Sequence, residues 1–188
     1  MGDRAFHILG VAGSLRKASY NRGLLRAAQE VAPEDVDIRT FDLSPIPLYN
    51  EDVEAQGDPE SVRQFKHAIA AADALLIASP EYNYSVSGVL KNAIDWASRP
   101  PQQTVLKGKP VAIMGASTGR FGTARSQLSL RQVLLATGCY VMPGPEVYVA
   151  QAPKGFDADS NLQDPRTRDR VRALIEALVD WSKRLKGR

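Results

Sequence analysis

The chain alternates short apolar runs with longer stretches in which apolar residues recur about every 3.6 positions, and this alternation limits its fold more than any other feature. Each short run is bounded by glycine, proline or polar residues, as a buried strand of a parallel sheet is. The predicted strands are Phe6–Ala12, Ala74–Ala78 and residues 110–114, with weaker candidates at Val36–Phe41 and at 140–142 continuing over 145–149. The sequence therefore predicts five strands.

The stretches between these runs predict five amphipathic helices, one after each strand. Asp58 and Asp164 each precede a proline, a pattern typical of an N-cap followed by a first-turn proline. The two consecutive prolines at 100 and 101 are expected to end the third helix. The apolar faces are Leu24, Leu25, Ala28, Val31 and Ala32; Val62, Phe65, Ile69 and Ala72; Val89, Leu90, Ala93, Ile94 and Ala97; Leu130, Val133, Leu134 and Thr137; and Val171, Leu174, Ile175, Leu178 and Val179.

A strict alternation of strand and helix builds a parallel sheet, because right-handed crossovers place the intervening helices on its two faces. We therefore predict an α/β fold, a doubly wound three-layer sandwich. A length of 188 residues suits one domain, and no linker or compositional shift divides it, so we expect a single domain over residues 1–188.

Composition excludes several classes of protein. The 24 Lys and Arg against 21 Asp and Glu give a net charge of only +3, and both signs are mixed along the chain, so no nucleic-acid partner is expected. The lone Cys139 cannot form an internal disulfide. The sequence has no apolar run of about 18 residues, and its first residues lack the pattern of a secretory leader, so we expect a cytoplasmic protein without a membrane partner.

The loop after the first strand carries the residues that a phosphate monoester requires. Ser14 and Ser19 supply hydroxyls, Asn21 an amide and Arg16 a guanidinium, and the loop runs into the start of a helix. It is neither a Walker A loop nor a GxGxxG motif, which disfavours triphosphate hydrolysis and ordinary dinucleotide binding. The alternative interpretation is a capped polar turn.

The loops after the third and fourth strands suit a planar ring system. Tyr82 and Tyr84 offer flat walls, and the glycines of residues 115–122 let backbone N–H groups approach a ligand closely. Ligands of doubly wound sheets bind at these strand ends. A phosphate loop beside two such loops predicts a mononucleotide site, and a flavin is one candidate.

Three segments strongly resemble the NADPH-dependent FMN reductase family, the flavodoxin-like quinone, azo-dye and chromate reductases. They are GSLRKASYN, SPEYNYSVSGVLKNAIDW and GASTGRFGTARSQLSLRQVL, and the likeness spans residues 6–149. The resemblance implies a five-stranded parallel sheet in the order 2-1-3-4-5, bound FMN, and a homodimer or homotetramer. It also implies that NADPH or NADH reduces the flavin, which then reduces a small-molecule acceptor (a quinone, an azo or nitro compound, or a metal oxyanion such as chromate) by ping-pong hydride transfer.

The resemblance also implies roles for individual residues. The phosphate would be held by Ser14, Arg16, Ser19 and Asn21. The isoalloxazine would be bordered by Pro80, Glu81, Tyr82 and Asn83, with backbone N–H groups of 81–83 near its N5, and its pyrimidine edge by Ser117, Gly119 and Arg120. No side chain is required as an acid catalyst, because the flavin itself carries the electrons. Glu81 is expected to form a salt bridge or to lie at an interface.

Several other residues are expected to have structural roles. Neither His7 nor His67 has metal-ligand spacing, so no metal site is predicted. Cys139 is expected to be a buried small hydrophobe and Trp96 a packing residue. The basic residues of 181–188 suit the C-terminal end of a helix.

Two long segments remain. Residues 44–56 are too long for an ordinary connection, and the resemblance places them near a dimer interface and the substrate entrance. Tyr49, in this segment, and Tyr84 are both expected to be exposed, which suits an interface core. Residues 150–163 match no pattern, and their role stays open.

Two alternatives compete with the enzyme. One is a flavodoxin-type electron carrier that also binds FMN, although such carriers are usually strongly acidic. The other is a flavin-free nucleotide-binding or regulatory module on the same fold.

Overall fold

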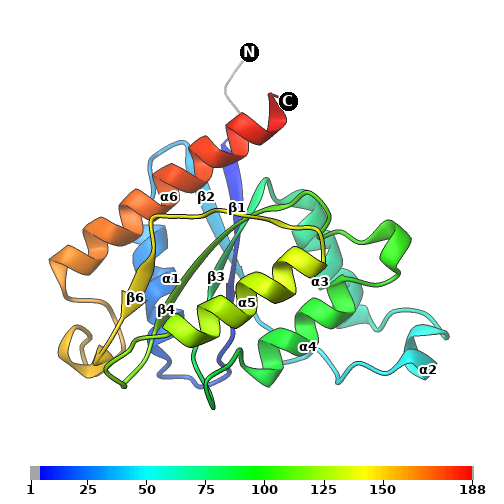
Figure 1. Cartoon of the computed structure of the whole chain (residues 1–188), viewed down its shortest axis with the longest axis horizontal. Coiled ribbons are helices and arrows are strands. Elements are labelled where there is room, and N and C mark those ends of the chain that lie inside the picture. Colours follow the sequence, from blue (N-terminus) through cyan, green and yellow to red (C-terminus); the bar gives the residue numbers. More distant parts are fainter. Residues whose placement is uncertain (1–4, 188) are drawn as a thin grey trace.

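The computed structural model describes residues 5–187, which form one parallel sheet with helices on both faces (Figure 1). Its strands are β1 (Phe6–Ala12), β2 (Val36–Phe41), β3 (Ala74–Ala78), β4 (Pro110–Ala116), β5 (Tyr140–Val141) and β6 (Val147–Val149). The strand order is β2-β1-β3-β4-β5, with β6 also paired to β4, so the predicted order is confirmed. The expectation about a leader involves residues 1–4, and they and Arg188 lie outside the described residues.

The edge of the sheet beside β4 differs from the prediction. The one predicted fifth strand is replaced by two short strands that pair with different parts of β4. β5 pairs with Pro110 and Val111, and β6 pairs with the part of β4 that begins at Met114. Pro143 and Pro145 lie between the two pieces and have no N–H to donate to the ladder. The prolines therefore divide the edge into two short strands.

All five predicted helices are present, and a sixth short one is new. They are α1 (Tyr20–Val31), α3 (Glu60–Ala71), α4 (Gly88–Ala97), α5 (Ala124–Ala136) and α6 (Pro165–Lys186), with the short α2 (Glu51–Glu54) inside residues 44–56. Asp164 caps α6, because its carboxylate accepts a hydrogen bond from the N–H of Thr167 at 3.0 Å. The same prediction for Asp58 is wrong: Pro59 occupies the N-cap of α3, and the Asp58 carboxylate pairs with Lys66 instead at 2.5 Å.

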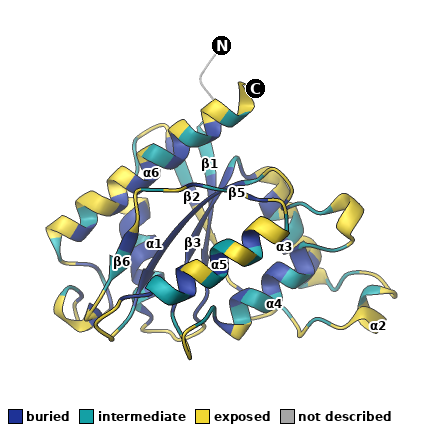
Figure 2. Cartoon of the chain, viewed as in Figure 1, coloured by how far each residue is buried: buried dark blue, intermediate teal, exposed yellow. Residues whose placement is uncertain are grey.

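Two apolar cores lie on opposite faces of the sheet. α1 and α6 cover one face, with Leu24 and Leu174 in its core, and α3, α4 and α5 cover the other, with Leu90 and Leu130 in its core. Every residue of β3 and β4 is buried, as the central strands in Figure 2 show. A fully buried leucine stabilises the fold by about 1.5–3 kcal/mol relative to an exposed one. The continuous apolar runs in the sequence arise because both faces of these strands are covered.

This architecture brings the ends of β1, β3 and β4 together at one edge of the sheet, and the three loops singled out from the sequence follow those ends. Among the described residues, no helix is long and apolar enough to cross a bilayer.

Candidate flavin site

A cavity of about 450 Å³ lies where the loops after β1, β3 and β4 meet. Its volume is within the range of small-molecule sites. Its lining is Ser14, Arg16, Ser19, Tyr20, Asn21, Pro80, Glu81, Tyr82, Ala116, Ser117 and Thr118. Of the residues predicted for the cofactor, Asn83, Gly119 and Arg120 lie outside this lining, and Tyr20, Ala116 and Thr118 are additions.

The loop after β1 forms a polar start to α1. Ser19 is the N-cap of α1, and its hydroxyl accepts a hydrogen bond from the N–H of Arg22 at 3.5 Å. Ser14 is buried, whereas Arg16 is exposed, with its guanidinium 5.3 Å from the centroid of the Tyr20 ring. No carboxylate pairs with Arg16 within residues 5–187. Hydroxyls, an unpaired guanidinium and the positive end of a helix dipole together suit an anion.

The side chain of Asn21 makes hydrogen bonds within the chain that the sequence did not predict. Its side-chain amide donates to the carbonyl of Ala116 at 3.0 Å, and its carbonyl accepts from the N–H of Ala116 at 2.9 Å. The buried side chain therefore ties the start of α1 to the end of β4. One amide N–H is left for a ligand, so the phosphate role of Asn21 stays a prediction.

Glu81 holds the loop after β3 against α5. One carboxylate oxygen accepts from the guanidinium of Arg125 at 2.6 and 2.5 Å. The other accepts from the backbone N–H groups of Arg125 and Ser126 at 3.0 and 3.1 Å. The N-cap residue Thr123 makes no side-chain capping bond, so Glu81, from another loop, accepts the hydrogen bonds of the free N–H groups in the first turn of α5. The expected salt bridge of Glu81 is confirmed.

The same loop then makes a tight turn at the mouth of the cavity. The N–H of Tyr82 donates to the carbonyl of Ser85 at 3.2 Å, and the N–H of Ser85 donates back to Tyr82 at 3.0 Å. Asn83 and Tyr84 occupy the turn with φ of +50° and +68°. Tyr82 is 54% exposed and walls the cavity. Its N–H serves the turn, so only the N–H groups of its two neighbours remain candidates for the flavin N5.

The loop after β4 packs closely against the other two loops. A Cβ on Gly115 would lie 2.2 Å from Thr123 Oγ1 and 2.4 Å from the carbonyl of Ser79, so this position admits only glycine. The N–H of Gly119 donates to the Ser117 hydroxyl at 3.1 Å. Ser117 lines the cavity, and the Arg120 guanidinium lies against the Phe121 ring, 5.0 Å from its centroid.

Residues 150–163, whose role the sequence left open, support the first and third loops. The N–H groups of Gln151 and Ala152 donate to the carbonyls of Gly119 and Ser117, each at 3.0 Å, and the Ser160 hydroxyl donates to the carbonyl of Ala18 at 3.1 Å. The segment rests directly on α1, where a Cβ on Gly23 would lie 1.9 Å from the Ser160 carbonyl. The sequence indicates this contact only through Gly23, a glycine inside an amphipathic helix.

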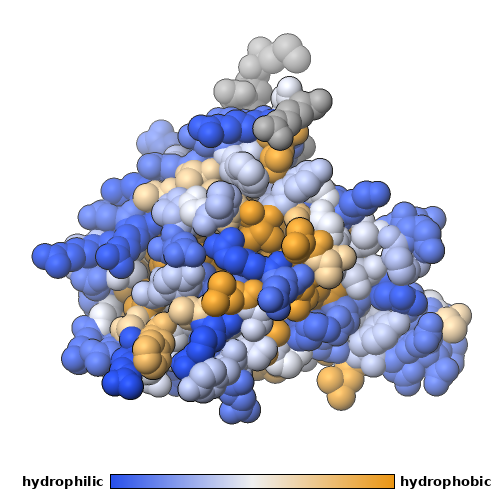
Figure 3. Space-filling view, in the orientation of Figure 1, coloured by the Kyte–Doolittle hydropathy of each residue, from blue (hydrophilic) through white to orange (hydrophobic). Residues whose placement is uncertain are grey.

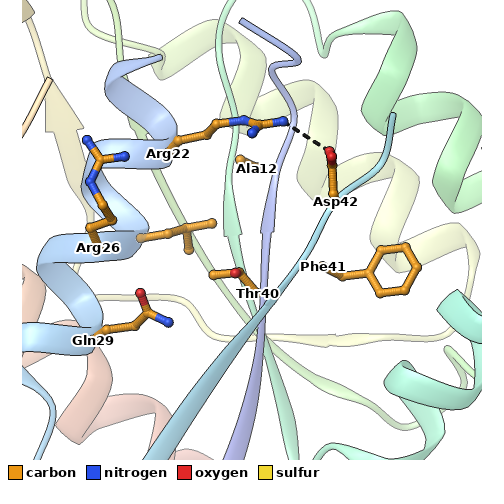
Figure 4. A pocket seen from close by; sticks show the side chains of 8 residues that line it. Ala12, Arg22, Arg26, Gln29, Thr40, Phe41 and Asp42 are labelled. Atoms are coloured by element: carbon orange, nitrogen blue, oxygen red, sulfur yellow. Dashed lines mark hydrogen bonds and ion pairs between the residues drawn. The ribbon is translucent and has the colours of Figure 1, made fainter. Parts of the chain in front are cut away.

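A smaller cavity of about 190 Å³ lies between α1 and β2 (Figure 4). Its two arginines are engaged by the chain itself. Arg22 donates to the Asp42 carboxylate at 3.0 Å and to the carbonyl of Ser14 at 3.2 Å. Arg26 donates to Asn161 Oδ1 at 2.9 Å and to the carbonyl of Ser160 at 2.9 Å. These cations hold loops in place and are not free for a ligand.

The structure also describes several residues for which a structural role is expected. Burial raises the pKa of the Cys139 thiol, which agrees with its expected inert role. The described residues contain no group of three or more metal-ligating side chains. Trp96 is buried and donates to the carbonyl of Pro47 at 2.9 Å. Tyr49 is mostly buried, because its ring packs edge-on against Trp96 with the ring centroids 5.0 Å apart, so its expected exposure is wrong. Tyr84 is 70% exposed, as expected.

The comparison with protein families decides the assignment. The model of the NADPH-dependent FMN reductase family matches residues 6–154. The chain belongs to this family. A relative from Pseudomonas aeruginosa, named an NAD(P)H-dependent FMN reductase, is 52% identical over 180 residues, which is 96% of this chain and 97% of the relative. The reductase is 45% identical to an NAD(P)H:quinone oxidoreductase of Solanum tuberosum over 187 residues, 96% of this chain and 95% of the relative.

A solved structure agrees with the fold of the reductase. The flavoenzyme NAD(P)H:(acceptor) oxidoreductase FerB of Paracoccus denitrificans matches with a TM-score of 0.86 and 38% identity, over 95% of this chain and 98% of that one. The expectations of an oxidoreductase, of FMN and of a pyridine-nucleotide donor are confirmed. The cavity fits this cofactor, because a polar helix start for the phosphate adjoins a slot walled by Pro80 and Tyr82 for the ring.

Proposed function

We propose that the reductase passes electrons from NAD(P)H through bound FMN to quinones, and also to azo or nitro compounds and to metal oxyanions such as chromate. Bound FMN supplies the ring that accepts and releases the electrons. The observation that carries the proposal is the one cavity formed by the loops after β1, β3 and β4, whose mouth is walled by the exposed Tyr82. Donor and acceptor must use that mouth in turn, which is a ping-pong order.

The side chains bind, orient and exclude water. Ser14, Arg16 and Ser19 hold the phosphate at the start of α1. Pro80 and Tyr82 would hold the ring, and Ser117 would hold its pyrimidine edge. Glu81 donates no proton, because both of its carboxylate oxygens are occupied by α5. The protons of quinone reduction therefore come from solvent at the open mouth.

The decisive experiment mixes the purified holoprotein with NADPH or NADH without oxygen and without any partner protein. We expect the flavin absorbance at about 450 nm to bleach at a rate compatible with turnover. Steady-state kinetics with a quinone should give parallel double-reciprocal lines. If only a separate reductase reduces the flavin, the protein is an electron carrier, and a colourless purified protein that binds no added FMN would favour the regulatory module.

Tyr82→Ala separates the ring wall from the phosphate anchor. The substitution should lower turnover more than FMN retention, because Tyr82 borders the exposed face while the phosphate loop is untouched. Turnover and the FMN content after desalting are the two readouts. Loss of FMN with unchanged turnover per bound flavin would contradict this role.

We also propose that the reductase is a homodimer or homotetramer. Apolar side chains gather in the middle of the face that Figure 3 shows, and on α5 Leu128 and Leu135 are 62% and 74% exposed, two turns apart. Covering such a stripe with another copy removes apolar surface from water. Light scattering should report at least twice 20.5 kDa at micromolar concentration, and a fully active species of 20.5 kDa would contradict the assembly. The cytoplasmic location and the absence of nucleic-acid and membrane partners stay predictions.

A further inference from the structure

Three side chains contact one another in series and end at the helix-start side of the flavin cavity. Phe156 packs against Tyr20, with the ring centroids 5.0 Å apart and the ring planes at 54°. The guanidinium carbon of Arg16 lies over the Tyr20 ring, 5.3 Å from its centroid. Arg16 and Tyr20 line the cavity, whereas Phe156 belongs to residues 150–163 and to the core on the α1 side of the sheet. The series therefore connects a buried core residue to an exposed cation at the site.

The place of the Arg16 side chain depends on the Tyr20 ring. Among residues 5–187, the exposed guanidinium of Arg16 makes no hydrogen bond and no ion pair. An exposed arginine samples many conformers, so binding an anion costs it conformational entropy. A cation is attracted to the face of an aromatic ring, which favours the conformers that lie over the ring. Tyr20 therefore limits the conformers of Arg16 before any ligand binds.

Tyr20 is itself held in place, so it can act as a support. It is the first residue of α1 and follows the N-cap Ser19, which fixes its backbone at the helix start. Phe156 is buried and belongs to a short antiparallel bridge with Leu162. Gly23 leaves room for this ring, because a Cβ there would lie 3.1 Å from Phe156 Cε1. The half-buried Tyr20 ring thus rests on a side chain that the core holds.

The neighbouring cation of the same loop has no such support. Lys17 is exposed and lies outside the cavity lining. Within residues 5–187 it has neither a carboxylate nor an aromatic ring as a partner. Of the two adjacent positive charges in the loop after β1, only Arg16 lies over a ring. The pair therefore distinguishes the positioning of a charge from its presence.

We propose that Tyr20 is a positioning residue of the phosphate site, whose ring, held by Phe156, keeps the Arg16 guanidinium at the cavity before FMN binds. The inference rests on the proposed function, in which Arg16 holds the phosphate. A guanidinium placed in advance loses less freedom when it forms its hydrogen bonds to a phosphate. Tyr20 then strengthens the binding of FMN through Arg16, and it does nothing for a flavin without a phosphate. Residues 150–163 act on the cofactor site through Phe156, which lies outside the cavity lining.

The test is a double-substitution cycle on flavin binding by the full-length apoprotein. FMN and riboflavin are titrated by calorimetry into the wild type, Tyr20→Leu, Arg16→Ala and the double variant. Tyr20→Leu should weaken FMN binding by about 2- to 30-fold, the range that a cation–π contact corresponds to. In the Arg16→Ala background the same substitution should change FMN affinity by less than about 2-fold, because no guanidinium is left to position. Riboflavin affinity should not change in any variant.

Three further variants serve as controls. Tyr20→Phe keeps the ring and should retain the wild-type affinity for FMN. Phe156→Leu removes the ring that holds Tyr20, so it should weaken FMN binding in the wild type but not in the Tyr20→Leu background. Lys17→Gln is the matched control for charge: its effect should multiply with that of Tyr20→Leu, because Lys17 has no ring partner within residues 5–187. Thermal unfolding of each apoprotein checks that the variants fold.

Several results would overturn the inference. Losses that multiply in the double variant of Tyr20 and Arg16 would show that the two side chains act independently. An equal loss for riboflavin would show that Tyr20 contacts the part that both flavins share, and a loss in Tyr20→Phe would assign the effect to the hydroxyl. The proposed function fails separately. Wild-type FMN affinity in Arg16→Ala would remove the phosphate role of Arg16, whereas wild-type affinity in Tyr20→Leu with a loss in Arg16→Ala would remove the inference alone.

Discussion

The arginines on α1 and the arginines in the loops at the flavin cavity are used in opposite ways. Arg22 and Arg26, which border the small cavity beside β2, donate to oxygens of their own chain. Arg16 and Arg120 lie at or beside the larger cavity and pair with no carboxylate within residues 5–187. An arginine whose hydrogen bonds are made within the chain holds the fold, and one left unpaired beside a cavity is available to an anionic ligand. Both cavities are lined by arginine, but among the described residues the chain itself supplies hydrogen-bond acceptors to the arginines of the smaller cavity only.

The largest effect is expected at the contact between α1 and residues 150–163, which Arg26 reinforces. Gly23→Ala should lower the free energy of unfolding by about 3 kcal/mol, because its Cβ would lie 1.9 Å from the Ser160 carbonyl and residues 150–163 would have to move. For a chain of this size, that corresponds to roughly 6–12 °C in Tm. Gly88→Ala is the matched control, since no atom lies within 4 Å of its Cβ position. Equal Tm values for the two variants would refute the close contact.

Arg26→Ala should have the next largest effect and should act on stability. The variant loses hydrogen bonds to Asn161, to the Ser160 carbonyl and to the Asp159 carbonyl at 3.0 Å, so we expect a loss of about 2 kcal/mol in the free energy of unfolding. Denaturation of the apoprotein measures it. A stable Arg26→Ala apoprotein with weakened FMN binding would assign Arg26 to the ligand and break the distinction between the two sets.

Glu81→Gln tests whether a buried carboxylate at the site is structural or catalytic. Losing its charge-assisted bonds to Arg125 and to the first turn of α5 should cost about 1.5 kcal/mol of stability. The shape of the pH profile of kcat/KM should stay as in the wild type, because Glu81 transfers no proton. Disappearance of one limb of that profile would instead make Glu81 an acid catalyst.

Asp164→Ala should have the smallest effect and a defined pH dependence. Hydrogen bonds from Thr167 lower the pKa of Asp164, so its contribution to stability is present above the ordinary aspartate pKa of about 3.9 and is lost as the pH falls through the lower folded value. We expect a cost of about 1 kcal/mol at pH 7. Thermal unfolding of both proteins at pH 7 and near pH 3 measures it. A Tm difference that grows toward acid would contradict this sign.

Features that depend on nearby residues in the chain could be predicted from the sequence, and features that depend on distant residues could not. The strands and helices followed from apolar periodicity, and the loops that line the cavity followed from their polar composition at strand ends. The break between β5 and β6 was not predicted, although Pro143 and Pro145 mark it. The failed cap at Asp58 shows that a local cap signal yields when Lys66, eight positions farther along the chain, pairs with the same carboxylate.

Contacts between segments that lie far apart in the chain could not be predicted from the sequence. Nothing near Glu81 in the chain indicates that its carboxylate caps α5, because Arg125 is 44 positions away. Asn21 similarly bonds to Ala116 across 95 positions. The support from residues 150–163 depends on an exact fit to Gly23, which only the folded chain displays.

The most direct test of the account is a double comparison at the phosphate loop. FMN and riboflavin, which lacks the phosphate, are titrated into wild-type and Arg16→Ala apoprotein. Because no carboxylate among residues 5–187 pairs with Arg16, we expect its loss to weaken FMN binding by about 10- to 150-fold and to leave both the weak riboflavin affinity and the apoprotein Tm unchanged. Equal losses for the two flavins, or wild-type affinity for FMN in Arg16→Ala, would contradict the claim that the loop after β1 holds the phosphate through an arginine kept free for it.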